Sequence, residues 1–171
     1  LTNRRQRQMC IRDRTNPAGV KHQVVGVFAP SLTETIAQVL QHLGSEHAVV
    51  VHSDDGMDEI SICAPTRVTE LNAGKLSSYT VQPADFGLKA APVESIVVGN
   101  PAESLALIDA VLDGEKSPAR DIVVLNAGAG IYVSGLANSL KSGVEMAQAA
   151  IDDGRAKAAK QAYVSATNEV A

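Results

Sequence analysis

Aromatic residues are scarce in this sequence, which has two Phe, three Tyr and no Trp among its 171 residues. Proteins that bind single-stranded nucleic acid stack the bases on exposed aromatic rings, so this class is disfavoured. Long hydrophobic runs are also lacking, because no stretch approaches the roughly 18 apolar residues of a membrane-spanning helix. We therefore expect an aliphatic core of Val, Leu, Ile and Ala, and no membrane partner.

Cysteine is rarer still, and the two residues Cys10 and Cys63 show neither the spacing of a metal site nor that of a redox site. A reduced, cytoplasmic setting is the expectation from this usage. The length favours a single domain.

Positive charge is concentrated at one end of the chain. Residues 1–14 contain five Arg and one Asp, whereas residues 15–171 carry 10 basic and 18 acidic residues. A basic arm is one way to bind nucleic acid, but the rest of the chain has no matching basic stripe. We expect residues 1–14 to be a disordered or non-native segment, and residues 15–171 to form the folded part.

Apolar runs predict buried strands at residues 22–28, 48–52 and 122–125, with a short strand at 60–63. The turn Asn72-Ala73-Gly74 predicts an antiparallel hairpin of residues 66–71 and 75–81. Helical periodicity covers residues 31–43, 101–112, 142–152 and 155–165, and a further helix is expected from about 131 to 140. This alternation predicts an α/β fold with a largely parallel sheet flanked by helices and one antiparallel hairpin.

Capping residues mark the ends of these helices. Ser31 with Glu34, and Ser142 with Glu145, have the spacing of a capping box. Asn100 before Pro101 is typical of a capped helix start. Gly44 stands where a left-handed C-terminal cap belongs.

The strongest chemical signal is an acidic loop after the second strand, where Asp54, Asp55, Asp58 and Glu59 fall within six residues. Crowded carboxylates repel one another unless cations compensate them. Mg²⁺ is such a cation, since it prefers oxygen ligands and takes one or two protein carboxylates together with water and phosphate oxygens. A solvated acidic turn is the alternative interpretation of this loop.

Two weaker signals lie nearby. Gly128-Ala129-Gly130 would suit anion binding at a helix N-terminus, although Val133 breaks the dinucleotide fingerprint and close packing is the simpler explanation. His52 could face the acidic loop as a ligand contact, or could be a hydrogen-bonded histidine at a strand end. No pairing of a nucleophile with a base emerges, so no catalytic residue is assigned.

Several segments in a fixed order resemble the C-terminal part of the catalytic domain of the anthranilate phosphoribosyltransferase family. The most specific is the acidic loop with its continuation. The matching segments are Thr15-Asn16-Pro17-Ala18-Gly19, Val25-Gly26-Val27-Phe28, Val49-Val50-Val51-His52, Asp55-Gly56-Met57-Asp58-Glu59-Ile60-Ser61, Pro65-Thr66-Arg67-Val68, Asp85-Phe86-Gly87-Leu88, and Leu125-Asn126-Ala127 with Tyr132-Val133.

The resemblance implies a fold, an activity and a metal site. Residues 15–171 would be a partial α/β glycosyltransferase catalytic domain. The family transfers phosphoribosyl from phosphoribosyl pyrophosphate (PRPP) to anthranilate in tryptophan biosynthesis and releases pyrophosphate. Its Asp-Glu pair binds Mg²⁺, which assigns metal binding to Asp58 and Glu59. The metal neutralises charge on the leaving pyrophosphate.

The sequence also departs from the family. Family members are about twice as long, and the helical dimer region, the glycine-rich pyrophosphate loop and the anthranilate-binding arginine precede the matching segment. We therefore expect an incomplete, inactive chain with an open sheet edge and exposed apolar surface. A non-catalytic binding or assembly module is the alternative, and a compact monomer would favour it. A nucleic-acid-associated protein is the third possibility, which salt-sensitive binding to DNA or RNA would support.

Overall fold

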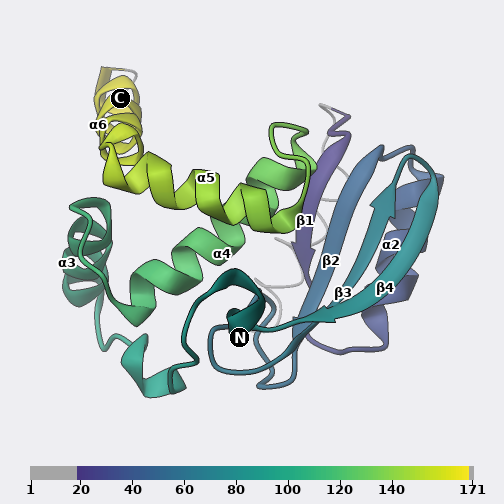
Figure 1. Cartoon of the computed structure of the whole chain (residues 1–171). Coiled ribbons are helices and arrows are strands. Elements are labelled where there is room, and N and C mark those ends of the chain that lie inside the picture. The colour runs from purple at the N-terminus through teal and green to yellow at the C-terminus, as the bar shows by residue number, and fades with distance from the viewer. Residues whose placement is uncertain (1–18, 170–171) are drawn as a thin grey trace.

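The computed structural model describes residues 19–169, so the expectations for residues 1–14 lie outside the described part. A four-stranded sheet carries helices on both faces, as an α/β fold requires (Figure 1). The elements in chain order are β1 (His22–Gly26), α2 (Leu32–His42), β2 (His47–Ser53), β3 (Thr66–Asn72), β4 (Lys75–Val81), the short 3₁₀ helices η1 (Pro83–Phe86) and η2 (Val93–Ser95), α3 (Pro101–Leu112), α4 (Pro118–Val133), α5 (Leu140–Asp152) and α6 (Arg155–Glu169).

The sheet is mixed, with the strand order β1-β2-β3-β4. β1 pairs parallel with β2, whereas β2–β3 and β3–β4 are antiparallel. The α/β class is confirmed, but the expectation of a largely parallel sheet is wrong for the described residues. A largely parallel sheet was expected because residues 122–125 were predicted to be a third buried strand. The structure shows that this segment is helical.

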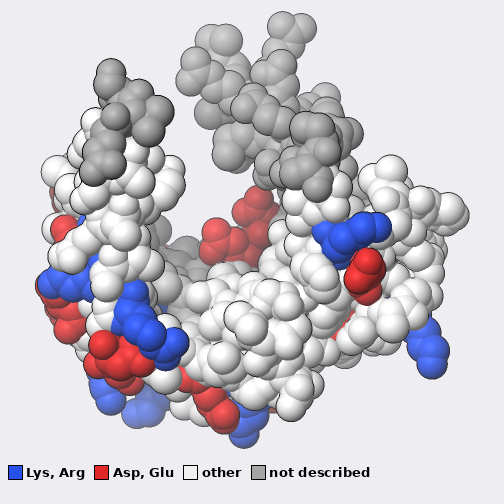
Figure 2. All heavy atoms as spheres, turned by 90° about the horizontal axis from the view of Figure 1, so that it is seen from above, with Lys and Arg blue, Asp and Glu red and all other residues white. Residues whose placement is uncertain are grey.

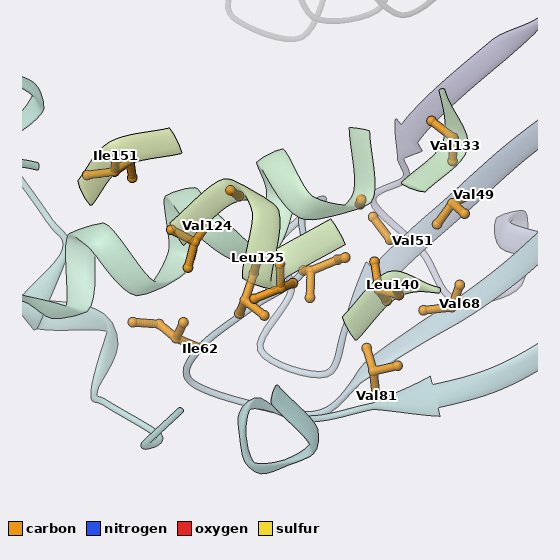
Figure 3. Packing of buried hydrophobic residues seen from close by; sticks show 14 of the residues in the cluster. Val49, Val51, Ile62, Val68, Val81, Val124, Leu125, Val133, Leu140 and Ile151 are labelled. Atoms are coloured by element: carbon orange, nitrogen blue, oxygen red, sulfur yellow. The ribbon is translucent and has the colours of Figure 1, made fainter. Parts of the chain in front are cut away.

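β2 is buried on both faces because each face has its own helical cover. Val49 and Val51 pack in the cluster that α4 and α5 complete, whereas Ala48 and Val50 pack with Leu40 of α2. Successive side chains of a strand point to opposite faces, so a strand covered on both sides must be apolar throughout. Figure 3 shows the first cluster, in which valines of the sheet meet Val124 and Leu125 of α4.

The hairpin and most helix ends follow local signals. The turn between β3 and β4 places Ala73 at φ 48° and Gly74 at φ 78°. The backbone N–H of Glu103 donates to Oδ1 of Asn100 at 2.9 Å, which confirms that cap. Gly44 has a φ of 80°, as a left-handed cap requires.

Two predicted capping boxes are wrong. Ser31 precedes α2 with φ −65° and ψ −16° and makes no side-chain cap bond. A capping residue needs an extended backbone to place its oxygen over the first N–H groups, and Ser31 is already helical. α5 begins earlier than predicted, and its box joins Ser139 and Ser142 instead of Ser142 and Glu145.

Residues 122–130 contain the largest error of the sequence-based prediction. The predicted strand at 122–125 and the glycine loop at 128–130 both belong to α4, a single helix of 16 residues. Gly128 lies where α4 crosses α5, and a Cβ atom there would stand 2.6 Å from the backbone nitrogen of Val144. Close packing is therefore the role of Gly128, and no anion-binding loop exists at this position.

α3 and α6 stand away from the sheet and pack on the far side of α4 and α5 (Figure 1). Lys157 and Lys160 of α6 form ion pairs with Asp113 and Asp109, which tie α6 to α3. Leu105 and Ile108 of α3 are exposed, whereas Val111 of the same helix is buried. Within the described residues β1 pairs only with β2 and is an edge strand of the sheet.

Candidate functional site

The acidic loop follows β2 at the edge of the sheet where the parallel strands β1 and β2 both end. Ligands of α/β sheets bind beyond the carboxyl ends of such strands. The backbone N–H of Ser53 donates to the carbonyl of Met57 at 3.0 Å, and Gly56, at φ 91°, allows the tight turn. The acidic loop is therefore a closed turn with a defined backbone conformation.

Asp55 holds the loop together from inside. Its Oδ1 accepts from the N–H of Met57 at 3.1 Å, and its Oδ2 accepts from Oγ of Ser61 at 2.6 Å. Burial acts to raise the pKa of Asp55, but the hydrogen bonds from Ser61 and Met57 outweigh it, so the pKa lies below its ordinary value. Asp55 is therefore a structural acid of the loop, a role that sequence reasoning did not separate from that of its neighbours.

Asp58 and Glu59 have a different environment. Both are exposed, and among residues 19–169 no hydrogen bond or ion pair engages either carboxylate. Together they line one side of a cleft of about 360 Å³ whose other walls are apolar residues of α3, α4 and the segment before α3, including Ile96, Leu107, Val111 and Ile122. Two adjacent, uncommitted carboxylates thus face an open space.

The donor set fits Mg²⁺ in part. Within the described residues no group of three or more His, Cys, Asp or Glu side chains could enclose a metal ion. Mg²⁺ does not need such a cage, because it commonly keeps several waters and binds through one or two carboxylates and phosphate oxygens of a substrate. Asp58 and Glu59 meet that lower requirement.

Acidic side chains also gather in a hollow between the sheet and the helices that stand away from it, α3 and α6 (Figure 1 and Figure 2). In the view from above, one group of Asp and Glu side chains lies within this hollow, and others lie on the outer surfaces beside lysines and arginines (Figure 2). A negative hollow attracts cations, because oriented charge lining a concave surface concentrates the field there.

His52 does not reach the loop as a ligand. It is 7% exposed, and its Nδ1 donates to the carbonyl of Val27 at 2.8 Å. The alternative interpretation, a hydrogen-bonded histidine at a strand end, agrees with this contact. The histidine joins β2 to the chain that leaves β1.

The segment after the acidic loop is buried but is not a strand, so the prediction for residues 60–63 is wrong. The N–H of Ile60 donates to Oδ1 of Asn126 at 2.9 Å, and Nδ2 of Asn126 donates to the carbonyl of Ile60 at 3.0 Å. A side chain of α4 thus takes the place of a neighbouring strand. Sequence reasoning missed this role of Asn126, because the two residues are 66 positions apart.

Similar proteins share one name. The chain is 49% identical over 156 residues to an anthranilate phosphoribosyltransferase of Nitrosomonas europaea, covering 91% of this chain and 46% of that protein. It is 52% identical over 153 residues to the one of Thioalkalivibrio sulfidiphilus, covering 90% of this chain and 45% of that protein. The chain therefore spans a little less than half the length of these curated relatives.

Solved structures give the same picture. The crystal structure of anthranilate phosphoribosyltransferase from Thermus thermophilus matches with a TM-score of 0.80 at 41% identity, over 88% of this chain and 44% of that one. The Saccharomyces cerevisiae enzyme in complex with PRPP and Mg matches with a TM-score of 0.69 at 23% identity, over 78% of this chain and 39% of that one, which supports the fold.

The similarity is also visible at the level of the family. The family model described as "Glycosyl transferase family, a/b domain" matches residues 14–157, most of the chain. Within residues 19–169 no helix is both long and apolar enough to cross a bilayer. The matched range contains the whole sheet, the acidic loop and the helices up to α5, and the chain belongs to this glycosyl transferase family.

Proposed function

We propose that this chain is part of an anthranilate phosphoribosyltransferase, which transfers phosphoribosyl from PRPP to anthranilate and releases pyrophosphate. One observation carries the proposal: the adjacent carboxylates of Asp58 and Glu59 are exposed, uncommitted and directed to a cleft at the carboxyl end of β2. The similarity to proteins of that name over about 90% of the chain supports the choice of reaction.

Asp58 and Glu59 are proposed to hold Mg²⁺. When bound, the ion supplies electrostatic stabilisation of the charge that develops on the pyrophosphate leaving group. The structure of the Saccharomyces cerevisiae relative in complex with PRPP and Mg supports the choice of Mg²⁺ as the cofactor. The two carboxylates contribute position and charge, and neither needs to move a proton.

The hydroxyl and imidazole side chains around the loop are already engaged. Oγ of Ser61 donates to Asp55 and accepts from the N–H of Cys63 at 2.8 Å. Oγ of Ser53 donates to the carbonyl of Pro65 at 3.3 Å, and His52 is bound to Val27. Because the carboxylates of Asp58 and Glu59 supply negative charge and no neighbouring hydroxyl or imidazole is free to act as a base, the loop is suited to electrostatic catalysis.

The remainder of the substrate site is proposed to come from the half of the protein that the relatives have and this chain does not span. The 171-residue chain is accordingly expected to be inactive by itself. Binding of anthranilate, a homodimeric state of the whole protein and a cytoplasmic location stay predictions from the resemblance and the cysteine usage.

The experiment that tests the proposal is a hybrid enzyme. Residues 15–171 would replace the matching segment of the Nitrosomonas europaea relative, and consumption of anthranilate would be followed by its fluorescence with PRPP and Mg²⁺ present. We expect the hybrid to turn over, and Asp58→Asn in it to lower kcat/KM by about a hundredfold, since a group that stabilises transition-state charge is lost. Raising the Mg²⁺ concentration should partly restore that variant.

The matched control is Asp54→Asn, the same change on an exposed carboxylate of the same loop. It is expected to leave kcat/KM within about threefold, because Asp54 is not one of the assigned ligands. A folded hybrid without turnover, or equal losses for both variants, would count against the proposed function.

A further inference from the structure

Asn126 makes three hydrogen bonds with one amide group. Its Oδ1 accepts from the N–H of Ile60, and its Nδ2 donates to the carbonyls of Ile60 and Ile122, at 3.0 Å each. The amide has two donor hydrogens, and both are used. Since its oxygen faces a donor and its nitrogen faces two acceptors, the amide has a single satisfactory orientation.

Ile60 directly follows Glu59 in the chain, and it is 1% exposed. A buried peptide group that lacks a hydrogen-bond partner is destabilising, so the N–H and C=O of Ile60 must be bound. Asn126 binds both, and no neighbouring strand does so among the described residues. The helix side chain therefore decides where the chain that leaves the acidic loop lies.

A second contact fixes the loop from the opposite side. A Cβ atom built on Gly26 would stand 1.6 Å from the carbonyl oxygen of Asp58, so the backbone of β1 touches the loop directly at that residue. The two peptides that bear Asp58 and Glu59 thus lie between the backbone of Gly26 and the amide of Asn126. Neither anchoring residue carries a charge, and neither carboxylate is used to hold the loop.

We propose that Asn126 is a positioning residue for the Asp58–Glu59 pair, holding the loop so that both carboxylates reach one cation in the cleft. The inference rests on the proposed function, because the cation is the one assigned there. Asn126 contacts neither the cation nor the substrate, and it acts through the backbone of Ile60. Partners that orient metal ligands from behind typically contribute ten- to a hundredfold to metal affinity.

The test uses the purified 171-residue chain and two variants, Asn126→Ala and Asn126→Asp. Asn126→Asp keeps an acceptor for the N–H of Ile60, but its second oxygen would face the carbonyls of Ile60 and Ile122, so it tests the two donated bonds. Gln41→Ala is the matched control, because Nε2 of Gln41 donates to the carbonyl of Gly74 at 2.8 Å, away from the loop. Each protein is measured by amide hydrogen exchange and by Mg²⁺ titration calorimetry.

In Asn126→Ala we expect the amide of Ile60 to exchange at least about tenfold faster while amides of β2 keep their rates. The Kd for Mg²⁺ should rise about ten- to a hundredfold in both Asn126 variants and stay unchanged in Gln41→Ala. Unchanged exchange at Ile60, or faster exchange with an unchanged Kd, overturns the inference. Absence of Mg²⁺ binding by the unaltered chain overturns the metal assignment itself, and is seen before any variant is compared.

Discussion

Gly128→Ala is expected to lower the free energy of unfolding by about 2 kcal/mol, even though alanine is the better helix former. The added methyl group would meet the backbone nitrogen and Cα of Val144 at 2.6 and 2.7 Å. Backbone atoms of a packed helix cannot rotate away, so α4 and α5 would have to separate along their whole contact. The measurement is urea unfolding followed by circular dichroism.

Gly130→Ala is the matched control in the same helix. A Cβ atom at Gly130 meets nothing within 4 Å, so only the gain in helix propensity remains. We expect this variant to be more stable by about 0.5–1 kcal/mol. If both variants shifted stability in the same direction, the close approach of α4 and α5 at Gly128 would be wrong.

The second large effect is expected at Glu70 of β3, whose buried carboxylate gathers donors from other elements. The hydroxyl of Tyr132 in α4 donates to it at 2.7 Å and that of Tyr79 in β4 at 2.9 Å. Nε2 of His47 in β2 lies 3.0 Å from the same carboxylate, and the ring of His47 stacks edge-on against Tyr132. Glu70 thus connects α4 to three strands, at the end of β2 opposite to the acidic loop.

Glu70→Ala is therefore expected to lower the free energy of unfolding by about 3 kcal/mol, since two phenol hydroxyls lose their acceptor. Burial raises the pKa of Tyr132 to about 12, with the bond to Glu70 adding to the effect, so this phenol remains a donor at neutral pH. Glu70→Gln should lose less, because it keeps one acceptor oxygen. Chemical unfolding at pH 7 measures both variants.

The pH dependence of stability is an independent test of the role of Glu70. Burial acts to raise the pKa of Glu70, but the hydrogen bonds from Tyr132, Tyr79 and His47 outweigh it, so the pKa in the fold lies below its ordinary value of 4.5. The ionised carboxylate then contributes stability above about pH 4.5, and this contribution is lost as the pH falls through the lowered pKa. The difference in stability between the unaltered chain and Glu70→Gln should shrink over that acidic range.

Glu46→Gln is the control for this series, because Glu46 is exposed and its carboxylate makes no hydrogen bond or ion pair with residues 19–169. It should match the unaltered chain at pH 7 and at pH 4 within about 0.5 kcal/mol. A gap between Glu70→Gln and the unaltered chain that widened toward pH 3 would contradict the assigned direction of the pKa.

Local patterns were sufficient for β2, the hairpin, α2 and α3. β2 was predicted because a continuous apolar run is what a strand covered on both faces needs, and the hairpin because an Asn-Ala-Gly turn separates two strand-like segments. α2 and α3 were predicted from helical periodicity with Gly44 and Asn100 at their ends. These signals lie within a dozen residues of the elements that they specify.

α4 could not be recognised in the same way. Its apolar residues face β1 and β2 on one side and α5 on another, so a short segment such as 122–125 looks like a buried strand. Gly128 then looks like the start of a loop, although its purpose is the crossing with α5, whose partner Val144 is 16 positions away. Only the tertiary contact distinguishes the two interpretations.

In the candidate site, too, the residues of the acidic loop could be predicted from the sequence, whereas the distant residues that hold the loop could not. Asp58 and Glu59 were assigned through the family resemblance, which the acidic loop carries most specifically, and this assignment stays a prediction; the structure places both residues on the cleft. The residues that hold the loop were not predicted, since Gly26 and Asn126 come from a strand and a helix on either side of it. Their contributions depend on distances that no local pattern encodes.

The most direct test of the account is the binding of Mn²⁺, a spectroscopic substitute for Mg²⁺ at carboxylate sites, to the purified 171-residue chain. The electron paramagnetic resonance signal of free Mn²⁺ falls as the ion binds. We predict saturable binding of one ion, competed by Mg²⁺ and abolished in the double variant Asp58→Asn/Glu59→Gln, with Asp54→Asn unaffected. Binding that survives in the double variant, or no binding by a chain shown to be folded, would contradict the metal assignment.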